Sequence, residues 1–170
     1  DVRSRKPISR FKIDKNPPTT IPVFNPTING MGTVPSNSVK RENDYITSLV
    51  WSPFSSCSFF AGTKNGRLIR FDISLGQIVK CEIIWEICFN FEIHHISIEP
   101  QFGQVCAVAS RNGSIATITR FDSNQKDKFP IASPDIIKLT KETDKIEEIR
   151  FYPTSEDFLI IVTSSSSMLY

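Results

Sequence analysis

The sequence has few of the residues on which catalysis and metal binding depend. Its 170 residues include only two histidines and four cysteines, with no Cys-x-x-Cys pair and no Cys/His cluster at zinc-ligand spacing. No phosphate-binding loop and no nucleophile elbow occur either. We therefore expect a protein without a metal, without a cofactor and without enzymatic activity.

Long apolar runs are also missing. No window approaches 18 consecutive apolar residues, so we expect no membrane-spanning helix, and the opening residues lack the apolar core of a signal peptide. The chain starts without Met and stops within a strand-like run, which favours a piece of a longer protein. The net charge of +2 is too small to indicate nucleic acid or a membrane surface as a partner.

Three of the four cysteines lie in apolar runs, at Cys81, Cys88 and Cys106. A free thiol in such a run packs as a small hydrophobic group. We therefore favour buried thiols in a reducing, intracellular compartment, and disulfides are the alternative. With 39% hydrophobic residues, the composition is that of an ordinary globular domain.

Residues 46–73 predict a three-stranded antiparallel meander. An apolar, β-branched run ends at Pro53, which cannot donate to a strand ladder, and a second short strand follows at 59–63. The dipeptide Asn65-Gly66 predicts a type I′ hairpin turn, because both of its central positions need a positive φ. Residues 67–72 then alternate between two faces, as a strand does.

The chain repeats after residue 44. A run that ends in proline recurs at Pro53, Pro100 and Pro153, which are 47 and 53 residues apart. Gly66 and Gly113 each follow their proline by 13 residues, and a serine stands at that offset in the third unit. A repeat of roughly 40 to 50 residues built from short strands indicates a β-propeller blade.

Each unit resembles a WD40 repeat. Trp51-Ser52-Pro53, residues 61–63, Asn65-Gly66 and Phe71-Asp72 occupy the places of the family's apolar strand, small-residue strand, turn and terminal dipeptide. The resemblance covers about residues 44–170 and implies an all-β, WD40-like propeller fragment of between two and a half and three four-stranded blades. It also implies a role in holding protein complexes together. The second unit repeats the pattern at 107–110, Asn112-Gly113 and Phe121-Asp122.

The units depart from that family in two respects. Phenylalanine replaces the usual tryptophan of the terminal dipeptide, and no Gly-His dipeptide opens a unit, although His94 and His95 lie near that place in the second. The family's hydrogen-bond network of His, Ser or Thr, Trp and Asp is therefore not expected here.

Residues 1–42 differ from the rest and hold six of the eleven prolines. They predict an extended, basic tail that lies along a partner or along the domain surface. Residues 11–13 and 21–24 are each expected to be a short edge strand or a hydrophobic anchor, and residues 29–32 are expected to be flexible. The propeller units are expected at about 44–90, 91–140 and 141–170, the last being incomplete. The fourth strand of the first unit is expected at 77–81 or 83–89.

Two groups of basic residues are candidates for binding a partner protein or nucleic acid. The turns that carry Lys64, Arg67 and Arg111 should lie on one rim of the ring, which often binds peptides or nucleic acid in WD40 proteins. Solvated surface charge is the alternative for both groups. The other group is in the tail: Arg3, Arg5, Lys6, Arg10 and Lys12.

A catalytic triad would have to use His94 or His95. Adjacent residues on a strand point to opposite faces, so at most one of the two faces any given site. The acidic pair Glu147-Glu148 alternates in the same way and is expected on the rim. A propeller hydrolase around one histidine is therefore a remote alternative.

Two complete units and part of a third cannot close a ring, and an unpaired blade leaves an apolar face to be covered. We therefore expect a non-catalytic scaffold subunit of a multiprotein complex, whose partner subunits complete or cover the propeller. The basic tail favours the nucleus, in a chromatin or transcription complex, over the cytoplasm. The alternative is a module that binds DNA or another nucleic acid through the tail and one propeller rim.

Overall fold

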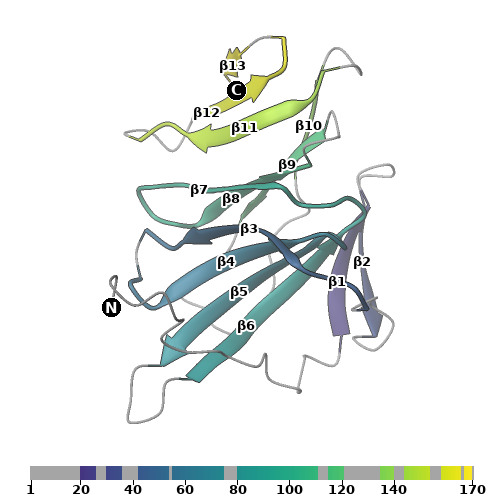
Figure 1. The fold of residues 1–170 in the computed structure, drawn as a ribbon, viewed down its shortest axis with the longest axis vertical. Helices are drawn as coiled ribbons and strands as arrows, with labels where there is room; N and C mark the ends of the chain where they lie inside the picture. Colours follow the sequence, from purple (N-terminus) through teal and green to yellow (C-terminus); the bar gives the residue numbers. More distant parts are fainter. Residues whose placement is uncertain are drawn as a thin grey trace.

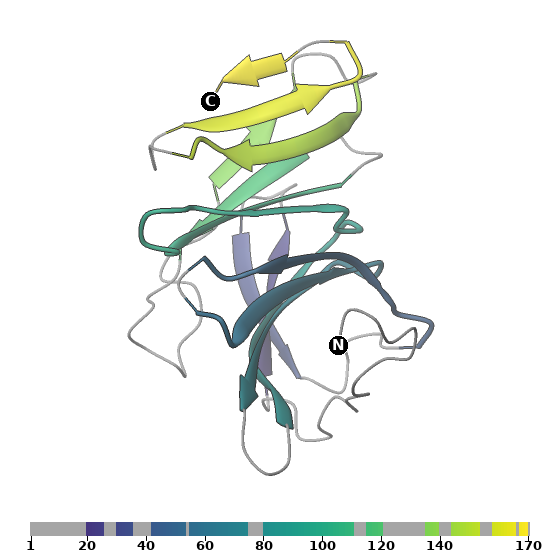
Figure 2. The same ribbon diagram turned by 60° about the vertical axis from the view of Figure 1, so that its left-hand side comes forward.

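The computed structural model describes residues 20–25, 30–35, 42–53, 55–74, 80–110, 115–120, 135–139, 144–153, 158–165 and 167–169. Every regular element in these ranges is a strand. The strands form three sheets that follow one another in chain order along the long axis of the molecule (Figures 1 and 2).

Unit 1 is a four-stranded antiparallel sheet, and it confirms the predicted meander. Strand β4 pairs with both β3 and β5, and β5 pairs with β6. The fourth strand is a single strand of ten residues that contains the whole of the candidate range 83–89 and the last two residues of 77–81, whose first three residues lie outside the described part of the chain. The strands are β3 (Ile46–Trp51), β4 (Ser58–Thr63), β5 (Arg67–Ser74) and β6 (Lys80–Phe89).

A hairpin from the N-terminal segment extends the sheet of unit 1. Strand β1 (Thr20–Asn25) pairs with β2 (Gly30–Pro35), and it lies parallel to β6 through Val23↔Cys88 and Phe24↔Phe89. A strand is therefore present at 21–24, but it lies between β2 and β6 rather than at the expected edge of the sheet. The other candidate segment, 11–13, lies outside the described residues. The flexibility expected at 29–32 is wrong from Gly30 onward, because pairing with β1 overrides the poor strand propensity of glycine.

Units 2 and 3 repeat the arrangement of unit 1. In each unit the first strand stands at one edge of the sheet, and β3, β7 and β11 lie side by side through the molecule (Figure 1). Unit 2 consists of β7 (His95–Ile98), β8 (Val105–Ala109), β9 (Ile115–Arg120) and β10 (Asp135–Lys138). Unit 3 consists of β11 (Ile146–Phe151), β12 (Leu159–Thr163) and β13 (Ser167–Leu169).

The turn between β4 and β5 lies where it was predicted, but it is of another type. Gly66 has a φ of 80°, whereas Asn65 is not in the left-handed region. The Gly66 amide donates to the Thr63 carbonyl at 3.1 Å, so Lys64 also belongs to a three-residue loop that ends in a left-handed glycine. The type I′ prediction is therefore wrong.

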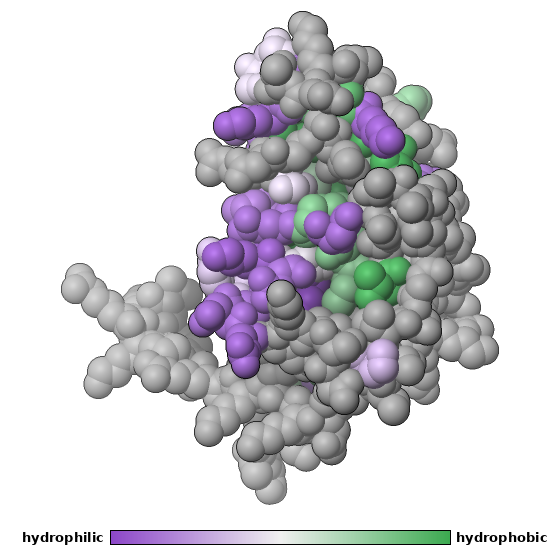
Figure 3. Space-filling model, turned by 90° about the vertical axis from the view of Figure 1, so that its right-hand side faces the viewer, coloured by the Kyte–Doolittle hydropathy of each residue, from purple (hydrophilic) through white to green (hydrophobic). Residues whose placement is uncertain are grey.

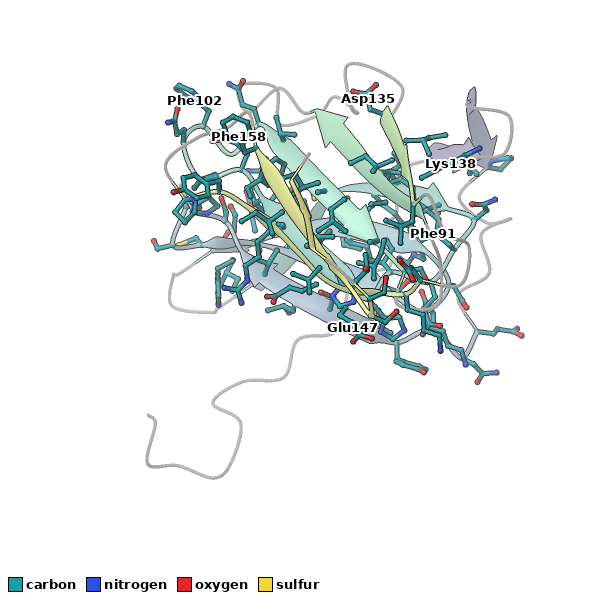
Figure 4. The ribbon with its side chains drawn as sticks, turned by 90° about the horizontal axis from the view of Figure 1, so that it is seen from above. Phe91, Phe102, Asp135, Lys138, Glu147 and Phe158 are labelled. Atoms are coloured by element: carbon teal, nitrogen blue, oxygen red, sulfur yellow. The ribbon has the colours of Figure 1, made fainter. Side chains whose placement is uncertain are left out.

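The apolar core lies between the sheets. One cluster joins units 1 and 2, and a second joins units 2 and 3. Figure 4, seen from above, shows side chains between the sheets, with Phe102 and Phe158 close together on one side of the view and Glu147 away from them. The first cluster consists of Phe60, Leu68, Ile87, Phe89, Ile93, Ile98, Cys106 and Val108.

Replacing Gly66 with alanine should destabilise the chain by roughly 1–3 kcal/mol. A Cβ atom there would clash with the carbonyl oxygen of Phe89 and would lie 2.5 Å from that of Phe91, and the backbone is left-handed. Urea unfolding followed by circular dichroism measures the loss. Lys64→Ala in the same turn is the control and should change the free energy by less than about 0.5 kcal/mol. Equal effects of the two variants would contradict this account.

Candidate protein-interaction surfaces

The first strands of the three units can be aligned through their strand pairs. Trp51, Ile98 and Phe151 each pair with the corresponding residue of the next strand and stand two residues before the repeated proline. Ile46 and Leu49 of unit 1 lie five and two residues before Trp51, so they correspond to the positions five and two residues before Ile98 and Phe151. The corresponding positions are Ile93 and Ile96 in unit 2, and Ile146 and Ile149 in unit 3.

The corresponding apolar side chains differ sharply in exposure. Ile146 is fully buried and Ile149 is 3% exposed, because unit 2 packs over them. In unit 1, Ile46 is 49% exposed, and Leu49 and Trp51 are each 52% exposed. We name Ile46, Leu49 and Trp51 the first flank. The corresponding positions of unit 3 are buried against unit 2, whereas these three side chains of unit 1 are exposed.

An aromatic row holds Trp51 in place. The Trp51 ring meets the Phe59 ring edge-on at 5.5 Å, and Phe59 stacks on Phe71 at 4.9 Å between ring centroids. The three side chains come from β3, β4 and β5, and Phe71 is buried. Trp51 is therefore a large apolar group that is both exposed and pre-positioned, which is typical of residues that dominate protein interfaces.

Arg67 lies inside unit 1 rather than on the rim. Its Nε atom lies 2.6 Å from Glu86 Oε1, and its Nη1 atom lies 3.1 Å from Asp44 Oδ2. Arg67 is 6% exposed and Glu86 is fully buried. Burial by itself would lower the pKa of Arg67, but the hydrogen bonds and charges of Glu86 and Asp44 raise it above its ordinary value.

The partner-binding role predicted for Arg67 is therefore corrected to a structural one, because two buried carboxylates bind its guanidinium. Asp44 also accepts a hydrogen bond from the Asn65 amide at 2.9 Å, which ties the turn to the start of β3. In unit 3, Asp144 accepts from the Ser165 hydroxyl at 2.6 Å in the same place. Sequence reasoning missed this contact, although an aspartate stands two residues before the first strand in both units.

Lys64 is exposed on the rim and lies over the ring of Tyr45, with Nζ 5.4 Å from the ring centroid. Figure 3 views the side of the molecule on which this turn lies and shows hydrophilic side chains gathered over neighbouring units. The other basic candidates lie outside the described residues, so the structure does not place them. They are Arg3, Arg5, Lys6, Arg10, Lys12 and Arg111.

The two histidines lie beside a groove between the first strands. His94 Nε2 is 3.0 Å from Glu92 Oε1, and both side chains are partly buried. The groove has a volume of about 530 Å³ and is lined by both histidines and by residues of β3, β7 and β11, with the repeated prolines among them. Within the described ranges, no three His, Cys, Asp or Glu side chains gather as a metal site would require.

The predicted acidic pair lies on the first strand of unit 3. Glu147 is exposed, and Glu148 accepts a hydrogen bond from Arg150 Nε. Of the cysteines, Cys88 and Cys106 are buried in the core, and burial raises the pKa of the Cys106 thiol well above its ordinary value. Cys106 therefore packs as an uncharged thiol, as its apolar surroundings predicted.

Comparison with solved structures identifies the fold. The chain resembles the β-propeller domain of Cps50 (Swd1) from Myceliophteria thermophila, with a TM-score of 0.56 and 11% sequence identity, over 82% of this chain and 46% of that one. The chain thus spans less than half of the propeller domain that it matches. No protein-family model and no curated protein matches the sequence.

The prediction of an all-β, WD40-like propeller fragment is confirmed at the level of the fold, and the three units are blades of a propeller. None of the described residues belongs to a helix that is long and apolar enough to cross a membrane. A shared fold at 11% identity says nothing about which molecule is bound.

Arg67→Met should lower the free energy of unfolding by about 3–5 kcal/mol, because it leaves Glu86 and Asp44 without their counter-charge inside the sheet. Urea unfolding of the chain measures the loss. Arg150→Met removes an arginine from an exposed pair with Glu148 and should cost less than about 1 kcal/mol. A loss for Arg67→Met no larger than this would refute the structural role.

Ile146→Ala and Ile46→Ala remove the same atoms from corresponding positions. The first should cost about 2–5 kcal/mol of unfolding free energy, because it opens a cavity between units 2 and 3. The second should cost less than about 1 kcal/mol, because Ile46 is half exposed. Similar losses from the two variants in the purified chain would show that Ile46 is covered in solution.

Proposed function

We propose that the chain is a non-catalytic scaffold that binds other proteins within a multisubunit complex. The observation that carries this proposal is the exposure of the first flank. Ile46, Leu49 and Trp51 project from unit 1 at positions that are filled interfaces in units 2 and 3.

Covering these side chains is favourable. Burying the half of each that is exposed would contribute roughly 3 kcal/mol in total, at about 2 kcal/mol for a fully buried large apolar side chain. A propeller blade also cannot bury both of its faces without neighbours. A protein partner that covers this surface therefore gains affinity from the same packing that stabilises the fold.

We place this scaffold inside the cell and favour the nucleus, in a complex that acts on chromatin or transcription, over the cytoplasm. The support for this is the basic N-terminal tail, whose charge pattern is that of a nuclear localisation signal. The alternative is a module that binds nucleic acid through the tail and one rim. Of the two rim candidates that the structure describes, Arg67 is bound by Asp44 and Glu86, and Lys64 is exposed. The rim therefore gives this alternative little support.

Affinity purification of the full-length protein from its native source, followed by mass spectrometry, tests the proposal. We expect a fixed set of co-purifying proteins in stoichiometric amounts that survives nuclease treatment. A protein that is recovered alone would contradict the scaffold function. A salt titration against nucleic acid, repeated with the tail charges neutralised, would then separate the alternative, because binding through phosphates weakens steeply with salt.

A further inference from the structure

We propose that residues 1–19 form a strap across the outer face of unit 1, with Phe11 and Ile13 packed over the side chains of Ile69 and Phe71. The outer face is the face of the sheet that points away from unit 2. This contact lies within the chain and is independent of the proposed scaffold function. The observation that carries it is a buried apolar cluster on the outer face.

Unit 1 is buried at the centre of both of its faces. Along β4 and β5, Phe60 and Leu68 belong to the core shared with unit 2, and the residues that follow them, Ala61 and Ile69, point to the outer face. Ala61, Ile69 and Phe71 form a cluster there, and none of the three is more than 2% exposed. The centre of the outer face is therefore as dry as the face that packs against unit 2.

The described strands do not account for this burial. Unit 1 lies at one end of the row of sheets, so unit 2 meets only one of its faces (Figures 1 and 2). Within the described ranges, the partly buried apolar side chains packed against the cluster, Phe59, Cys81 and Ile83, come from the same sheet. Side chains on one face of a sheet stand side by side and do not cover one another, so a further segment lies over them. Because the cluster is buried within the chain itself, this segment belongs to the 170 residues.

The N-terminal segment has the position and the length for this cover. Strand β1 runs parallel to β6, with Val23 beside Cys88, so the residues that precede β1 head towards the start of β6. Phe11 lies nine residues before Thr20, the first residue of β1. Nine extended residues span up to about 30 Å, whereas the two strand spacings from β6 to β4 are roughly 10 Å. The tail is therefore long enough to bring Phe11 over the cluster.

Other segments outside the described ranges fit this place less well. The connection 75–79 joins two paired residues at the end of a hairpin, so it is too short to reach Ile69, five residues before the end of β5. Residues 36–41 contain a single apolar side chain. The longer connections join strands of units 2 and 3, which lie on the other side of the sheet.

The sequence of the tail suits an extended strap. In an extended segment Phe11 and Ile13 point to one side and Lys12 to the other, so two apolar side chains meet the sheet and the ammonium group stays in water. A cover that comes from β1 also accounts for the exposure of Leu49 and Trp51, because they lie on β3, the strand at the opposite edge of the sheet. Residues before Phe11 then continue towards β3, which brings the basic end of the tail beside the first flank.

Photo-cross-linking tests the strap. Phe11 is replaced by p-benzoylphenylalanine in the full-length protein, which is irradiated at low concentration, and the cross-linked peptides are identified by mass spectrometry. We expect a cross-link within the chain to the outer face of β4, β5 or β6, at residues such as Ile69 and Phe71. The same probe in place of Lys12 is the matched control and should give at least about ten-fold less of this product, because alternate residues of an extended segment point to opposite sides.

Several results would overturn the strap. They are a cross-link from position 11 to unit 2 or unit 3, to a second copy of the chain or to another protein, the absence of any cross-link, and equal yields from the two probe positions. The scaffold function is tested separately by co-purification, so a failure of the strap and a failure of the scaffold are distinguishable.

Alkylation of Cys81 is a second measurement. Its thiol packs against the cluster, and burial, together with two nearby carboxylates, raises its pKa. Combining Phe11→Asp with Ile13→Asp should uncover the face and speed the reaction of this thiol with iodoacetamide at least about ten-fold, because access and thiolate character both increase. Lys12→Asp is the control and should change the rate by less than about two-fold. An unchanged rate in the double variant, with circular dichroism showing it folded, would contradict the strap.

Discussion

The packing of each unit's first strand against the small-residue face of the preceding unit is the interaction on which the rest of the structure depends. Ile93 packs against Gly62, and Ile146 lies in the same buried cluster as Ala109. In unit 1 the side chains at two of the corresponding positions, Leu49 and Trp51, are exposed.

A second constraint is electrostatic and lies within unit 1. Arg67, Asp44 and Glu86 place one positive and two negative groups in a largely dry site, where they are stable only together. The cluster ties the start of β3 to β5 and β6 and sets the position of the turn at Gly66. Asp44 stands two residues before Ile46, the first residue of the first flank. The buried ion pair with Arg67 therefore fixes the position of the strand that carries the exposed side chains.

Much of the fold was predictable because the signals are local. The prolines that end the first strands and the glycines of the turns recur at fixed offsets, and alternation along 67–72 places Ile69 and Phe71 on one face. The turn type was not predictable, since Asn65-Gly66 is compatible with a two-residue or a three-residue loop and the register of β4 against β5 decides between them. Strand β2 was missed because its Gly-rich sequence forms a strand only when it pairs with β1.

The sequence by itself determined the class of fold and the repeat, because these follow from strand periodicity and spacing. The sequence could not decide whether Arg67 is exposed on the rim or buried, because the same local pattern, a charged residue beside a turn, is compatible with both positions. The sequence also could not predict that Ile46 and Ile146 differ in exposure, because both lie two residues after an aspartate at the start of a strand. Only the tertiary structure decided that one is exposed and the other buried, because burial depends on which sheet lies opposite, and sequence position does not encode that.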